Sequence, residues 1–203
     1  MKNNSPQLPL TLSLSPGFLL LLSAVYFFCP PGTLGAYLLA VLPHELGHVA
    51  AISASGQRIT GLHFRASGLS LDYFSHSGPG WGVLAALSGP ALGLLCCFLI
   101  SLVGNLTGCD YLFFCAGLGL LLNCFNLLPV LPLDGGVAVS LLLKERFSAD
   151  MAERLMLLLS LLTAVLLLSL GIVFLVRSGS LSCLSAGIWV LCLTICKKSC
   201  PCK

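Results

Sequence analysis

Long apolar stretches follow one another along this chain, and short segments rich in glycine, proline or polar residues separate them. A stretch of about 20 apolar residues forms a helix long enough to cross a bilayer. Six stretches are predicted to be transmembrane helices: 8–29, 33–53, 82–104, 111–133, 155–176 and 179–196. We therefore expect an all-α polytopic membrane protein with about six transmembrane helices, in which residues 1–203 form a single membrane-embedded domain.

The segment between the second and third predicted helices has a different pattern. Apolar and polar residues alternate over 69–73, and this alternation is typical of a half-buried β-strand. Together with residues 59–64 and a turn at 65–68, it predicts a short β-hairpin. An open strand edge can bind an extended peptide by strand addition, although an ordinary surface hairpin fits the same pattern.

Composition agrees with a membrane protein. Hydrophobic residues make up 57% of the chain and charged residues 8%, and the mean hydropathy is +1.02. A soluble domain carries about 25% charged residues, so the lipid bilayer is the expected surrounding. Basic residues do not cluster among aromatic ones, and this excludes a nucleic-acid-binding surface of the usual kind.

The basic residues predict the orientation in the membrane. With a cytoplasmic N-terminus and six spans, nine of the ten lie on the cytoplasmic side, where Lys and Arg are normally in excess. Both termini are then cytoplasmic. The nine are Lys2, Arg58, Arg65, Lys144, Arg146, Arg154, Lys197, Lys198 and Lys203, whereas Arg177 falls on the other side.

Three ionisable residues lie together inside the second predicted helix. His44 and His48 are four residues apart, so both imidazoles project from one face of the helix. This spacing suits one zinc ion, and Glu45 is placed to polarise a bound water. Ionisable groups at membrane depth are costly and mark functional sites by default. An inert packed cluster is the structural alternative.

A catalytic zinc ion usually has three protein ligands and one open position. Asp134 is the natural third ligand, because Pro129, Pro132 and Gly135-Gly136 break the helical pattern around it. Irregular backbone at membrane depth is tolerated where it is buried in protein or lines a cavity. The alternative is that the helix simply ends at the membrane boundary. The same prolines and glycines would then place Asp134 at the membrane–water interface and not at a metal site.

These motifs carry a family resemblance. The sequence His44-Glu45-x-x-His48, followed by Asn126-x-x-Pro129 and Asp134, resembles the site-2 protease family of intramembrane metalloproteases, and most of all its sporulation-type branch. The resemblance covers about residues 33–136, which would be the catalytic core.

The resemblance implies a role for each of these residues. His44, His48 and Asp134 would bind one zinc ion, and Glu45 would be the catalytic base. Asn126 and Pro129 would shape the substrate channel.

Ser88-Gly89-Pro90 in the third predicted helix matches a further signature of the same family. Relatives often have an asparagine three residues after that proline. In this chain the position is Gly93, so the sequence departs from the family pattern there.

The expected activity is zinc-dependent hydrolysis of a peptide bond in or near a transmembrane segment of a membrane-associated protein. The resemblance implies a sigma or anti-sigma factor as substrate and the plasma membrane of a bacterium as location. The loops at 54–81 and 135–154 are too short for a peptide-binding PDZ domain, so regulation would come from a membrane partner or from substrate presentation. The alternative is a non-proteolytic zinc-binding protein, such as a transporter or a pseudoprotease scaffold. A transporter is expected to have repeated halves, and neither motif occurs a second time in this chain. Glu45 argues against a pseudoprotease, because binding zinc alone does not require that base.

Overall fold

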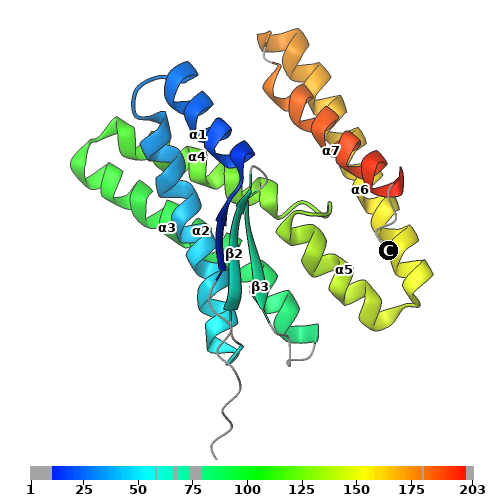
Figure 1. The fold of residues 1–203 in the computed structure, drawn as a ribbon. Helices are drawn as coiled ribbons and strands as arrows, with labels where there is room; N and C mark the ends of the chain where they lie inside the picture. The colour runs from blue at the N-terminus through cyan, green and yellow to red at the C-terminus, as the bar shows by residue number, and fades with distance from the viewer. Residues whose placement is uncertain (1–10, 58, 66–67, 74–78, 180, 200–203) are drawn as a thin grey trace, which may run out of the picture.

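The computed structural model describes residues 11–57, 59–65, 68–73, 79–179 and 181–199. Most of this part of the chain is helical (Figure 1). The helices are α1 (Pro16–Phe28), α2 (Thr33–Ala54), α3 (Pro79–Thr107), α4 (Asp110–Asn126), α5 (Asp134–Arg146), α6 (Ala149–Ser178) and α7 (Ser182–Ser199). The strands are β1 (Thr11–Leu14), β2 (Ile59–Arg65) and β3 (Gly68–Tyr73).

Three of the described helices are long and apolar enough to cross a membrane, namely α2, α3 from Gly80 onward, and α6. Helices α4 and α7 are apolar but shorter, so the six predicted spans are not confirmed. Many large apolar side chains lie on the outside of the helices, among them Leu121 and Val176 at 68% and 81% exposure. Exposed apolar surface on this scale requires a partner, and the bilayer of an integral membrane protein provides it.

Two predicted spans are shorter helices in the structure than expected. In the span predicted at 8–29, residues 8–10 lie outside the described part, residues 11–14 form β1, and the helix begins only at Pro16. The span predicted at 111–133 ends at Asn126, because the two prolines that follow cannot continue the helical hydrogen bonding.

Residues 135–154 were expected to be a loop, and most of them instead belong to helices. Helix α5 was missed because it has Gly135-Gly136 in its first turn and ends with Lys144, Glu145 and Arg146. These residues lower its hydropathy well below that of a spanning helix.

The sheet is small and lies beside the helices. Strands β2 and β3 pair antiparallel, as expected for the hairpin, with Leu62 opposite Leu71. Strand β1 pairs parallel to β2, with Ser13 opposite His63, so the strand order is β1-β2-β3. The edge strands are therefore β1 and β3, and β3 is on the side of the sheet that faces α5 (Figure 1).

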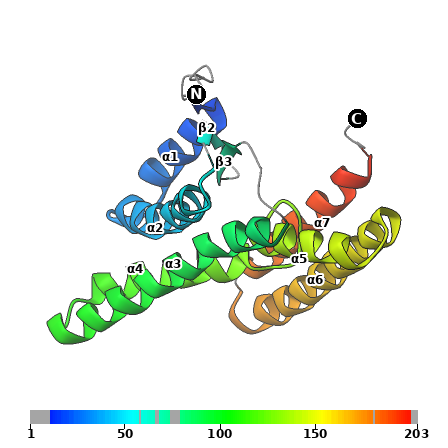
Figure 2. The same ribbon diagram turned by 90° about the horizontal axis from the view of Figure 1, so that it is seen from below.

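Helices α2, α3 and α4 pack against one another, and α5 packs on α3. Helices α6 and α7 form an antiparallel pair beside α5 (Figures 1 and 2). The segment 127–133 joins the two groups, because its Val130 and Leu133 are buried with Ala164 of α6 and Val190 of α7. This anchored segment fixes the place where α5 begins.

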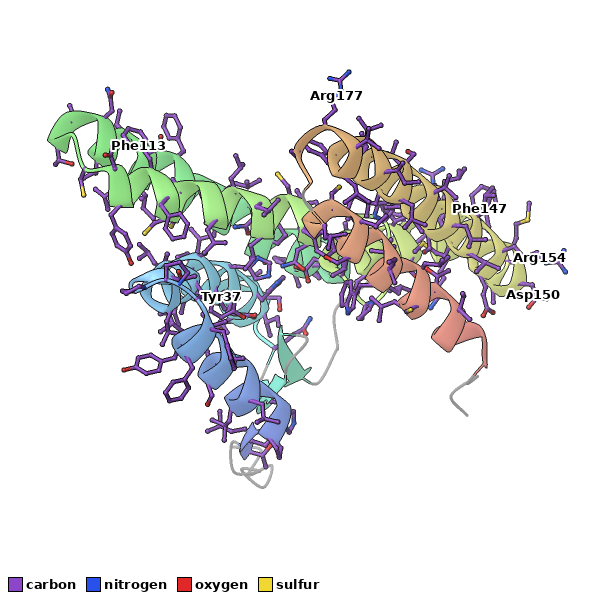
Figure 3. The ribbon with its side chains drawn as sticks, turned by 90° about the horizontal axis from the view of Figure 1, so that it is seen from above. Tyr37, Phe113, Phe147, Asp150, Arg154 and Arg177 are labelled. Atoms are coloured by element: carbon purple, nitrogen blue, oxygen red, sulfur yellow. The ribbon has the colours of Figure 1, made fainter. Side chains whose placement is uncertain are left out.

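The charges of α6 are separated along its length. Asp150 and Arg154 lie at one end of the helix, and Arg177 lies at the other (Figure 3). This separation is compatible with the predicted orientation, in which Arg177 alone is on the outer side. Lys2, Arg58 and Lys203, which belong to the same prediction, lie outside the described residues.

Candidate metal centre

Helix α2 carries the two histidines on the face that packs against its neighbours. It continues through Pro43, the residue just before the motif. The side chain of His44 is buried and that of His48 is partly buried. Their Nε2 atoms are 3.3 Å apart, a separation that the four-residue spacing allows because both rings point from one helix face.

Asp134 reaches the same point from another part of the chain. It is the first residue of α5 and is partly buried. Its Oδ2 atom lies 3.2 Å from His44 Nε2 and 3.4 Å from His48 Nε2. The structure thus brings together the three residues predicted to bind the metal, two from α2 and one from α5.

The other ring nitrogen of each histidine faces an oxygen acceptor. His44 Nδ1 lies 2.9 Å from Asn123 Oδ1, and His48 Nδ1 lies 2.7 Å from the carbonyl oxygen of Ala85. A carbonyl oxygen only accepts hydrogen bonds, so both Nδ1 atoms carry hydrogen. In the neutral rings, the lone pairs of both Nε2 atoms therefore point toward Asp134.

The three atoms fit a zinc ion. Two imidazole nitrogens and a carboxylate oxygen are a normal catalytic zinc donor set, with bonds of about 2.0–2.2 Å. Tetrahedral ligands at such distances are about 3.3–3.6 Å apart, and the three separations here, 3.2, 3.3 and 3.4 Å, lie near or just below the lower end of this range. Three electron-rich atoms this close together repel one another unless a metal ion or a proton lies between them.

Glu45 also belongs to this cluster. One of its carboxylate oxygens lies within 4.8 Å of the ligand nitrogens of His44 and His48, and the residue is partly buried. Two carboxylates could therefore supply the third ligand. The distances of Asp134 Oδ2 from the two Nε2 atoms, 3.2 and 3.4 Å, suit ligands that share one zinc ion. With Asp134 as the third ligand, Glu45 would lie beside the metal position, where a catalytic base would act.

Helix α3 approaches α2 closely at the motif, and two glycines make this possible. A Cβ atom on Gly47 would overlap the Ser88 carbonyl oxygen, and one on Gly89 would overlap the His48 ring. Helices α2 and α3 can therefore pack this closely only because positions 47 and 89 carry no side chain.

The two residues predicted to bind substrate lie just before α5. Asn126 ends α4, and Pro129 lies in the irregular segment that follows. Both are partly buried, and Ser160 Oγ of α6 donates a hydrogen bond of 3.4 Å to the Pro129 carbonyl. Their role in binding substrate stays a prediction.

Asn123 is a site residue that the sequence analysis missed. It is fully buried and contacts a proposed metal ligand, yet it lies in an apolar helix outside the motifs that singled out the other site residues. The available signal was the cost of burying a polar side chain at membrane depth, the same argument that singled out His44.

Comparisons with known proteins agree with this geometry. A family model described as Peptidase family M50 matches residues 103–170, a range that includes Asp134 but not the His44–His48 motif. The structure is similar to a site-2 protease from Methanocaldococcus jannaschii, with a TM-score of 0.66. The sequences are 18% identical, and the alignment covers 92% of this chain and 89% of that one. The chain has the fold of a site-2 protease. Neither comparison supports the sporulation-type branch in particular, and no curated protein matches the sequence.

Proposed function

We propose that this protein is an intramembrane zinc metalloprotease of the site-2 type. The observation that carries the proposal is the convergence of His44 Nε2, His48 Nε2 and Asp134 Oδ2 within 3.4 Å of one another. The match to Peptidase family M50 and the shared fold support the same activity.

One zinc ion bound by these three residues would activate a water molecule and polarise the scissile carbonyl. Glu45 takes a proton from the attacking water and later delivers it to the leaving amine, as a general base and then a general acid. His44 and His48 are kept in the ligating orientation by their Nδ1 hydrogen bonds. Asn126 and Pro129, which precede Asp134, line the approach of the substrate.

The substrate class we propose is a membrane-associated protein cut in or near its transmembrane segment. A helical segment hides its carbonyl groups in hydrogen bonds, so it has to unwind before cleavage. The open edge of β3 would hold the unwound segment extended by strand addition. A sigma or anti-sigma factor is the member of this class that the resemblance implies.

The strand-addition role predicts where a substrate contacts the sheet. A photo-crosslinking residue placed at Ser70 of β3 should give a covalent adduct with a single-span substrate. The same residue at Ser13 of β1, on the opposite edge of the sheet, is the matched control and should give none. Equal adducts from both strands, or adducts from β1 alone, would contradict binding at the β3 edge.

The proposed setting is the plasma membrane of a bacterium, with both termini in the cytoplasm. The distribution of basic residues supports this orientation, and the separation of Arg154 from Arg177 along α6 is compatible with it (Figure 3). Cleavage would then occur near the cytoplasmic face and release a cytoplasmic product. A membrane partner or the presentation of the substrate would regulate the reaction.

Metal removal tests the proposed activity. The purified full-length protein should contain about one zinc ion per chain, and treatment with a zinc chelator should abolish cleavage of a single-span substrate. Adding zinc, but not magnesium, should restore cleavage, because nitrogen ligands suit zinc and oxygen ligands suit magnesium. Circular dichroism of the treated protein controls for unfolding. Cleavage that persists in a folded, metal-free sample would contradict the proposal.

A further inference from the structure

Asn123 is a fully buried polar residue that has no direct part in the proposed reaction. It lies in α4 with 0% exposure, between α2 and α3, against which α4 packs. A buried amide without hydrogen bonds destabilises a protein by about 1–3 kcal/mol or more. Such a residue is therefore expected to have specific partners, and here both of its polar atoms have one.

The two partners fix the direction of the amide. Asn123 Nδ2 donates a hydrogen bond of 2.7 Å to the carbonyl oxygen of Gly119, one turn earlier in the same helix. Its Oδ1 atom therefore faces His44, where it accepts the Nδ1 hydrogen at 2.9 Å. The reverse orientation would place two oxygen acceptors against each other at Gly119. The amide thus selects the form of His44 in which Nε2 is free to bind a metal.

Helix α3 is shaped to admit this side chain. A Cβ atom added to Gly93 would overlap the amide of Asn123, with Oδ1 the nearest atom. Any larger residue at position 93 would displace Asn123 from His44. Position 93 is also where the family signature often has an asparagine. In this chain, an asparagine fills that space from α4 instead of α3.

We infer that Asn123 is a positioning residue that holds His44 in its Nδ1–H form as a zinc ligand, and that Gly93 provides the space for it. This inference rests on the proposed zinc site. Outer-shell partners of metal-binding histidines fix the tautomer and ring orientation, and their loss typically weakens metal binding by about 10–100-fold.

The test compares zinc affinity and histidine protonation in variants of the full-length protein. Asn123→Leu keeps the volume but removes the acceptor, and it should weaken zinc binding by about 10–100-fold in competition with a chelator. Asn123→Asp keeps an oxygen acceptor for His44, and its protonated carboxyl can donate to the Gly119 carbonyl as the amide does, so it should retain most of the affinity. Nitrogen-15 spectra of the metal-free protein should show the Nδ1–H form of His44 in the wild type and lose that preference in Asn123→Leu.

A matched control is Thr163→Val, which removes a buried hydroxyl that donates a hydrogen bond to the Leu159 carbonyl of the same helix, α6. Its zinc affinity should equal that of the wild type, and similar helicity in all variants shows that they fold. Unchanged affinity and tautomer in Asn123→Leu would overturn the inference, as would an Asp variant as weak as the Leu variant. If the wild type itself bound no zinc, the proposed function would fail instead.

Discussion

Replacing Glu45 with glutamine is expected to lower the cleavage rate by about 10²–10⁴-fold, the usual contribution of a general acid–base group. Glutamine has nearly the same size and shape, but its amide cannot take a proton from the attacking water. Zinc content should stay at the wild-type value, because Asp134 Oδ2 lies 3.2 and 3.4 Å from the two Nε2 atoms and supplies the third ligand in the proposed site. The measurements are the initial rate on a single-span substrate and the metal content of the purified protein.

Glu145→Gln is the matched control for this experiment. Glu145 is exposed near the end of α5, and the same chemical change there should leave the rate unaltered. Equal processing by the wild type and Glu45→Gln would contradict the protease assignment. With zinc still bound, that result would favour the non-proteolytic alternative, a transporter or a pseudoprotease scaffold.

The features that were predictable from sequence are those fixed by local geometry. The four-residue spacing of His44 and His48 places both rings on one helix face whatever the rest of the fold does. The prolines and glycines around Asp134 mark a break in the helix wherever they occur in an apolar segment. The structure has that break at Leu127–Leu133 and brings Asp134 to the histidines.

The features that were missed depend on distant parts of the chain. Strand β1 is four residues long and pairs with β2, whose residues lie about 50 positions later, and no local pattern reveals such a partner. Helix α5 is neither apolar enough nor regular enough to stand out by hydropathy.

The contact between Gly93 and Asn123 likewise depends on residues that are far apart in the sequence. It joins two helices at positions 30 residues apart. Read separately, the glycine is a departure from a family signature and the asparagine is an isolated polar residue. Only the packing of α3 on α4 shows that one side chain occupies the space left by the other.

Replacing Asp134 with alanine is expected to weaken zinc binding by more than about 100-fold, because losing even an outer-shell partner costs about 10–100-fold. The Oδ2 atom of Asp134 is the third point of the triangle it forms with the two Nε2 atoms. Without it, the two histidines alone would hold the ion, and cleavage should fall to background. The measurements are zinc content after dialysis against a weak chelator and the rate on the single-span substrate.

Asp134 also lies in the first turn of α5, where a carboxylate stabilises the helix by interacting with its dipole. Asp150→Ala controls for that effect, because Asp150 also lies in the first turn of its helix, α6, and is far from Tyr37 of α2 (Figure 3). This control should keep its zinc. Zinc content unchanged by Asp134→Ala but lost in Glu45→Gln would make Glu45 the third ligand. Loss of zinc in Asp134→Ala but not in Glu45→Gln would identify Asp134 as the ligand and leave Glu45 as the base. The distances of Asp134 Oδ2 from the two histidines predict this result.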